Sequence, residues 1–236
     1  MAEGLTTQYP LKWDQIGEKL YELGTSHGVL YRLGTKGEPE DGVAWNGLIA
    51  VKQSPDGAEA KPIYANDHKY IEMTSAENFK GNIEAFTYPE EFKACDGSKE
   101  LMPGVYAGQQ NRVPFHLAYS TRIGNDTEGE TFAEKIHLIY NAKVAPSARD
   151  YTTINEDPEA ITFSWEFTTT PMEVAQELVD RGFKNTAYIE IDGSLLTPAQ
   201  MKAIKDILYG TADAPARMPK IDELADILAT GEGAEG

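Results

Sequence analysis

The sequence predicts a mainly β fold of the α+β class, with a helical segment at its C-terminal end. Short stretches in which apolar and polar residues alternate recur along residues 1–193, and this period of two is typical of strands with one face in a core. Clusters of Gly, Pro, Asn and Asp separate these stretches, as turns do. Only residues 194–236 change to the apolar spacing of helices. We therefore expect a β domain over residues 1–193, followed by a helical C-terminal segment.

The N-terminal part of the chain predicts one strand and one long loop. Apolar residues in Trp13–Leu33 stand at helical spacing, but the many glycines there are equally compatible with a turn or an extended arm. Residues 43–52 predict a strand. The next stretch, Ser54–Lys69, is rich in Pro, Gly, Asn and Asp and predicts a long loop. Compact domains seldom keep a loop of that length without a function for it.

The middle of the chain predicts four strands and one helical turn. The strands are expected at residues 70–74, 79–88, 112–123 and 132–144. The last two are joined by the short acidic loop Gly124–Glu130 and therefore predict a β-hairpin. Residues Pro89–Gly97 predict a single helical turn, because Pro is favoured at the first helical position and Gly just after the last.

The C-terminal third mixes strands with helices. Residues 160–170 have the clearest period-2 pattern of the chain, and residues 186–191 predict a further strand. The ambiguous stretch between them, residues 172–184, suits a short helix. Thr197 and Pro198 are typical of a helix start, and we expect this helix to run through Leu208. A second short helix over residues 221–228 and a flexible acidic tail are expected to follow.

Charge and composition argue against several classes of function. The chain has 21 basic and 38 acidic residues, a formal net charge of −17, and no quarter of it is net positive. Gripping DNA or an anionic membrane requires a basic surface, so neither is expected. No apolar run reaches the roughly 20 residues that cross a bilayer, and the N-terminus lacks a signal-peptide pattern. The single Cys95 excludes an internal disulfide. We expect an intracellular protein.

No residue pattern predicts catalysis, a cofactor or a metal ion. The four histidines, His27, His68, His116 and His137, lack the spacing of a zinc site. Two of them, His116 and His137, lie on the strands of the expected hairpin, where we expect neighbouring, half-exposed side chains. No Ser or Cys stands in a nucleophile motif. Glycoside hydrolysis needs two facing carboxylates, but with 38 acidic residues such a pair could occur in almost any fold, so the acids do not indicate a glycosidase. The acidic loop Asn125–Glu130 favours an ordinary turn over a calcium site because it lacks EF-hand spacing.

The aromatic residues have two interpretations. Most of them stand at alternating strand positions, as in a β core: Trp45, Phe115, Tyr119, Tyr140, Phe163, Trp165 and Phe167. A carbohydrate-binding platform would also place aromatic rings on one face of a sheet. The core interpretation is favoured, and a carbohydrate-binding β-sandwich or β-rich glycosidase stays open as an alternative.

Several stretches resemble the major tail protein, or tail tube protein, of long-tailed phages with non-contractile tails. The resemblance spans about residues 13–210 and is carried by GVAWNGLIAVKQSPDGAEAKPIYANDHKY (42–70), IEAFTYPEEFKACDG (83–97), RIGNDTEG (122–129), KIHLIYNAKVAPS (135–147) and INEDPEAITFSWEFTTTP (154–171). It implies a β-sandwich or barrel with a flanking short helix, an N-terminal arm and no enzymatic activity. It also implies hexameric rings that close a continuous inner barrel and stack into the tube through which phage DNA leaves.

The same resemblance implies partners and candidate residues. The partners are further copies of the chain, a tape-measure protein, and tail terminator or distal tail proteins, in a virion assembled in the bacterial cytoplasm. A long loop in relatives reaches the neighbouring ring, which here corresponds to residues 53–69, with Ser54, Pro55, Asp56, Lys61, Tyr64, Asn66 and Asp67 as candidate contacts. DNA would be cargo that is not gripped, so acids on strands are candidates for the lumen: Glu72, Glu84, Glu134 and Glu166. A tail terminator or connector is a further alternative.

Overall fold

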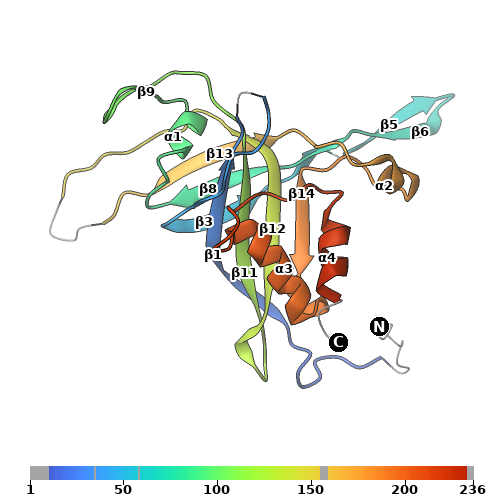
Figure 1. The fold of residues 1–236 in the computed structure, drawn as a ribbon. Helices are drawn as coiled ribbons and strands as arrows, with labels where there is room; N and C mark the ends of the chain where they lie inside the picture. The colour runs from blue at the N-terminus through green and yellow to red at the C-terminus, as the bar shows by residue number, and fades with distance from the viewer. Residues whose placement is uncertain (1–10, 35, 58, 155–158, 233–236) are drawn as a thin grey trace.

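The computed structural model describes residues 11–34, 36–57, 59–154 and 159–232, and it is mainly β with a few short helices (Figure 1). The strands are β1 (Tyr21–Arg32), β2 (Val43–Ala44), β3 (Leu48–Gln53), β4 (Asp56–Gly57), β5 (Ala60–Ala65), β6 (His68–Thr74), β7 (Glu77–Asn78), β8 (Lys80–Ala85), β9 (Lys99–Met102), β10 (Val105–Ala107), β11 (Phe115–Asn125), β12 (Gly129–Val144), β13 (Phe163–Thr169) and β14 (Tyr188–Asp192). The helices are α1 (Phe92–Cys95), α2 (Gln176–Asp180), α3 (Pro198–Tyr209) and α4 (Leu224–Glu232), with one 3-10 turn at Gly193–Leu195.

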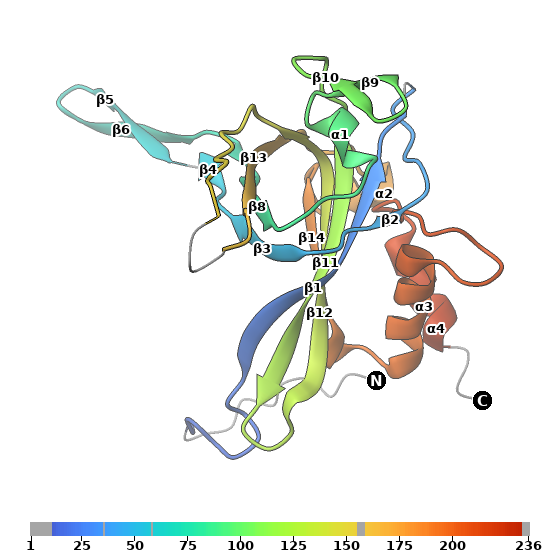
Figure 2. The same ribbon diagram turned by 90° about the vertical axis from the view of Figure 1, so that its left-hand side faces the viewer.

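Eight of these strands form one antiparallel sheet that curls on itself. Seven strands follow the order β2-β1-β11-β12-β13-β8-β3. The eighth, β14, pairs with residues 135–139 of β12, next to residues 142–144, which pair with β13. Seen from the side in Figure 2, the upper parts of the strands bend round a common axis, so that β3 at one end of the order contacts β1 near the other. The curled part is a partly closed barrel.

The sheet has a hydrophobic core on each face, because side chains of the central strands alternate between the two sides. Inside the curl, Leu117 and Ile139 pack with Trp45, Trp165 and other buried residues, and Phe92 and Cys95 of α1 belong to the same core. The outer face carries Ala118, Ile136, Leu138 and Tyr140, against which α3 and α4 pack. This second layer explains why β11 and β12 are buried on both faces.

Helix α3 is held by its ends and by its contact with the sheet. Thr197 forms a capping box with Gln200, and Pro198 takes the first helical position. The helix ends at Gly210, whose φ of 76° suits glycine best. At the C-terminal end, the buried Tyr31 hydroxyl donates to the Leu208 carbonyl oxygen at 2.6 Å. The last turn is therefore tied to the central sheet.

Strand β12 changes its neighbour at a bulge. Residues 135–139 pair with β14, whereas residues 142–144 pair with β13. Between the two regions Asn141 has a φ of 49°, and its backbone N–H donates to Nδ1 of His116 at 2.8 Å. The bulge shifts the alternation, so that Tyr140 faces the helices while Ala142 faces the inside of the curl.

Most expected elements are confirmed, and two expectations were wrong. The stretch Trp13–Leu33, for which the sequence left a helix and a turn or arm open, holds strand β1, because pairing with β11 outweighs the helical spacing of a few side chains. The loop expected over Ser54–Lys69 is a β-hairpin, β5–β6, preceded by β4. The strand expected over residues 43–52 is interrupted by a turn at Gly47, whose φ is 75°. The last residues of the expected acidic tail, 233–236, lie outside the described residues.

No helix within the described residues is both long and apolar enough to cross a bilayer.

Candidate functional site

The hairpin β5–β6 projects from the body of the molecule as an arm (Figures 1 and 2). Its turn is formed by Asn66 and Asp67, with φ values of 53° and 61°. Two consecutive residues with positive φ are the geometry of the tight type I′ hairpin turn, which matches the natural twist of the two strands. The arm is therefore an ordered element, and we call residues 60–74 the arm from here on.

The arm exposes large apolar side chains on a two-stranded ribbon. Ile63 lies directly opposite Ile71, with Met73 two residues further along the same face. The exposed fraction of these residues and of the two tyrosines runs from 45% at Ile63 to 71% at Tyr70; the set is Ile63, Tyr64, Tyr70, Ile71 and Met73. An isolated hairpin is marginal in water, and exposed apolar patches mark sites of protein contact. The arm thus has the character of a contact element.

The base of the arm is fixed to the sheet by backbone and charge contacts. Strand β4 pairs with β7, and the Ser54 backbone N–H donates to the Lys80 carbonyl oxygen at 2.8 Å. Asp56 accepts a hydrogen bond from the Lys80 ammonium at 2.8 Å, and this bond lowers the pKa of the Asp56 carboxyl. These contacts connect the arm to β8, a strand of the curled sheet.

The candidate contact residues from the sequence fall into two groups. Ser54, Pro55 and Asp56 lie at the base, while Lys61, Tyr64, Asn66 and Asp67 lie on the arm itself. Sequence reasoning missed Tyr70, Ile71 and Met73, because it divided the hairpin into a loop and a separate strand. The signal that could have found them is the Asn-Asp pair between two short β-prone runs.

The four acids named as candidates for the lumen lie on different surfaces. Glu72 lies on the arm, where it pairs with Lys69 at 2.7 Å. Glu84 and Glu166 lie on the outer, polar face of β8 and β13, and Glu84 pairs with Lys52 at 2.5 Å.

Glu134 lies on the helix-covered face of β12, paired with Lys205 of α3. Burial alone would raise the pKa of its carboxyl, but the Lys205 contact lowers it overall. The candidate set therefore divides among three surfaces.

A different acidic group lies on the face of the sheet opposite helices α3 and α4. Lys135 on β12 pairs with Glu22 of β1 and, at 3.1 Å, with Glu190 of β14. Asp192 lies directly opposite Lys135 on the same face. The lysine is almost fully buried, and its hydrogen bond with Glu22 raises the pKa of its ammonium. Its cation thus joins the two outer strands β1 and β14 across the sheet.

One cluster contains the residue types of a catalytic triad but not its geometry. His27 Nδ1 lies 3.3 Å from the Ser120 hydroxyl and 3.9 Å from the Glu134 carboxylate. In a triad the two ring nitrogens divide these roles, one facing the nucleophile and the other facing the acid. Here a single nitrogen faces both groups, and Ser120 is fully buried. The arrangement does not fit acyl transfer.

The two hairpin histidines were expected to be half-exposed neighbours, and this was wrong. Both are buried and they face opposite sides of the sheet. His116 packs on Tyr140 toward the helices, whereas His137 stacks on Tyr119, its ring centroid 4.6 Å away, on the other face. Helices α3 and α4 cover the face of the sheet that carries His116, which would otherwise be open to solvent.

In the described part of the chain, no group of three or more His, Cys, Asp or Glu side chains is arranged to hold a metal ion.

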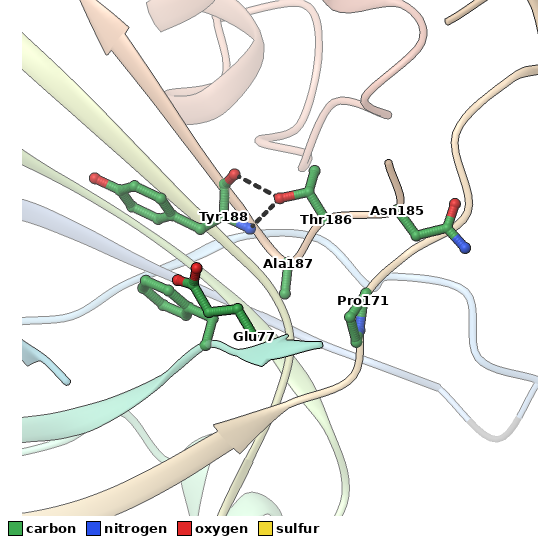
Figure 3. A pocket seen from close by; sticks show the side chains of 7 residues that line it. Glu77, Pro171, Asn185, Thr186, Ala187 and Tyr188 are labelled. Atoms are coloured by element: carbon green, nitrogen blue, oxygen red, sulfur yellow. Dashed lines mark hydrogen bonds between the residues drawn. The ribbon is translucent and has the colours of Figure 1, made fainter. Parts of the chain in front are cut away.

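A shallow pocket lies between the start of β8 and β14 (Figure 3). Its described lining is Glu77, Phe79, Pro171, Asn185, Thr186, Ala187 and Tyr188. Phe79 stacks on Tyr188 at 4.7 Å, and the Thr186 hydroxyl bonds to the Tyr188 backbone. Glycoside hydrolysis needs two facing carboxylates, and Glu77 is the single acid among these residues.

The aromatic residues expected in a core are there. Trp45, Trp165 and Phe167 are buried inside the curl, and Trp45 packs against Phe92 in a tilted arrangement with the ring centroids 4.5 Å apart. The exposed aromatic residues, by contrast, include Tyr64 and Tyr70 of the arm.

No protein-family model matches the chain, and a comparison with curated proteins finds no match.

Proposed function

We propose that the chain is a structural subunit that assembles with copies of itself into a tube, as the major tail protein of a non-contractile phage tail does. The observation that carries the proposal is the arm: an ordered hairpin that stands away from the body and exposes Ile63, Ile71 and Met73. The resemblance of residues 13–210 to tail tube proteins supports it. Rings of six copies would stack, each arm contacting the neighbouring ring.

The energetics of the arm support an assembled state. Fully burying an apolar side chain of this size contributes about 1.5–3 kcal/mol. The apolar side chains of the arm are about half exposed, so covering several of them together still stabilises a repeated contact between subunits. The second small hairpin, β9–β10, adds exposed Leu101, Met102 and Val105 at another side of the body. Contact elements on more than one side suit a subunit with several neighbours.

The charge suits a conduit for DNA. A net charge of −17 repels phosphates, so DNA would pass without being held. In this role the protein is part of the virion, and a tape-measure protein and tail terminator or distal tail proteins are its other partners.

The arm supplies the test. Ile71→Lys places a charge in the centre of its apolar face, whereas Thr74→Lys adds the same charge at the end of β6. Both variants should unfold within about 0.5 kcal/mol of the unchanged protein, because both side chains are exposed and, among the described residues, β5 and β6 pack mainly against each other. By negative-stain microscopy, the unchanged protein and Thr74→Lys should form stacked tubes, and Ile71→Lys should not.

Tubes of Ile71→Lys as long as those of the unchanged protein would contradict the role of the arm. Single rings that never stack, formed by the unchanged protein, would favour a tail terminator or connector.

A further inference from the structure

A guanidinium group lies in a corner between two aromatic rings beside α1. The rings of Tyr88 and Phe163 are nearly perpendicular, at 83°, with their centroids 5.3 Å apart. The Cζ atom of Arg149 lies 5.8 Å from the centroid of the Tyr88 ring and 5.6 Å from that of the Phe163 ring. Both distances fall within the range at which the face of an aromatic ring attracts a cation.

A buried carboxylate completes this corner. Asp96 directly follows α1, its side chain is 8% exposed, and its carboxylate forms an ion pair with Arg149. A buried carboxylate that lacks a cation is costly, because water no longer solvates its charge. The corner therefore requires a cation. Its two rings favour a planar guanidinium over the compact, strongly hydrated ammonium of a lysine.

The walls of the corner are held by contacts that do not involve the arginine. The Tyr88 ring packs edge-on against Trp165 with the centroids 5.4 Å apart, and the Phe163 ring stacks on Trp165 at 5.7 Å. Asp96 is held at its backbone, where its N–H donates to the Phe92 carbonyl oxygen at 2.9 Å. The corner should therefore keep its shape without the arginine, preorganised for a guanidinium group.

Arg149 belongs to a segment that is largely exposed. Residues 145–154 follow β12 as an extended segment without helix or strand, and we call them the strap (Figure 1). The first residue of the strap is held by a backbone hydrogen bond of 2.8 Å to β13. Four residues later the Arg149 side chain joins the strap to the body, whereas Tyr151 and Ile154 beyond it are 69% and 86% exposed. Arg149 thus fastens the strap.

We propose that Tyr88, Asp96 and Phe163 form a binding site for the guanidinium group of an arginine. Arg149 occupies this site as a ligand built into the chain, and its departure frees the strap from the body. The site goes beyond the tube-forming function and does not depend on it. Because the walls stay in place, a small guanidinium compound fits the site once the Arg149 side chain is removed.

Chemical rescue tests the site. Arg149→Ala leaves the Asp96 carboxylate without its cation, so this variant should melt about 5 °C below the unchanged protein. Methylguanidinium at millimolar concentration should recover more than half of this loss, because it can enter the empty site. Methylammonium should not, since it lacks the planar group.

The matched control is Arg181→Ala. The Arg181 guanidinium lies 5.3 Å from the centroid of the Phe183 ring and, within the described part of the chain, forms no ion pair with a carboxylate. The melting temperature of Arg181→Ala should therefore not respond to methylguanidinium.

Two results would overturn the site. One is a melting temperature of Arg149→Ala that does not respond to methylguanidinium, and the other is an equal response to methylammonium. If Arg149→Ala does not fold, Arg149→Lys supplies the test. Its melting temperature should lie below that of the unchanged protein, and an equal value would show that any cation serves.

Proteolysis tests the strap. Chymotryptic cleavage after Tyr151, followed by mass spectrometry, should be several-fold faster in Arg149→Ala than in the unchanged protein, because the strap is no longer fastened. Cleavage after Tyr64 of the arm is the internal control and should keep its rate. Methylguanidinium should leave the fast cleavage after Tyr151 in place, since it fills the site without holding the strap. Equal rates after Tyr151 in the two proteins would overturn the role of Arg149 in fastening the strap.

Discussion

The burial and the pKa of a polar residue on the central strands depend on which core layer covers its face of the sheet. His116 illustrates this, because the helices cover its face of β11 and leave its Nδ1 as acceptor for the Asn141 backbone N–H. Its neighbours are uncharged: the Tyr140 ring packs at 5.4 Å, and burial is the whole cause of its lowered pKa. The alternation of β11 predicted which side His116 occupies. It could not predict burial, since nothing in the strand itself shows that helices 80 residues later return to that face.

The buried His116 should make stability depend on pH. Burial lowers its pKa from 6.5 to about 4, so between these values the unfolded chain binds a proton that the folded chain does not. The free energy of unfolding should therefore fall as pH falls, by up to about 2 kcal/mol between pH 7 and pH 5. Burial lowers the pKa of His137 as well, which adds in the same direction.

Urea unfolding at the two pH values checks this. His116→Asn, which keeps a side-chain acceptor, should lose a clear part of the pH dependence, and His68→Asn on the exposed arm is the matched control. An unchanged pH dependence in His116→Asn would show that His116 is not the titrating group.

Strands and helices were predictable to the extent that their signal is local. The hairpin β11–β12, strand β13 and helix α3 each have a strong period and clear ends, and the structure confirms them. Strand β1 has neither, since Gly24 and His27 with positive φ interrupt its pattern and its pairing with β11 decides its form. The arm was missed for a different reason. Its polar tip, Asn66 and Asp67, is typical of loops and of hairpin turns alike, so the sequence did not distinguish a loop from a hairpin there.

Close packing of β3, β8 and β13 depends on Gly81. A Cβ at this position would lie against the Lys52 carbonyl oxygen and 2.8 Å from the Phe167 ring, inside the 3.0 Å that real Cβ contacts respect. Gly81→Ala should therefore lower the free energy of unfolding by about 1–3 kcal/mol. Gly108→Ala, where a Cβ meets nothing within 4 Å, is the matched control and should stay within about 0.5 kcal/mol. Equal stabilities of the two variants, measured by chemical denaturation, would contradict this packing.

At the scale of the whole molecule, the features with no role in a monomer share one explanation. The arm and the hairpin β9–β10 both expose apolar side chains that a second copy can cover. The acidic charge, which from composition argued only against gripped DNA, agrees with a sheet face opposite α3 and α4 that holds Glu22, Glu190 and Asp192 around one lysine. Which acids share that face could not be predicted from sequence, because it depends on pairing between strands far apart in the chain.

Electron microscopy of the purified, unchanged protein, with sedimentation velocity over a range of concentrations, tests whether the protein self-assembles. We expect hollow rings that stack into tubes, and a sedimenting species that grows with concentration. A single species of 26.0 kDa at every concentration, with no rings in the images, would contradict it.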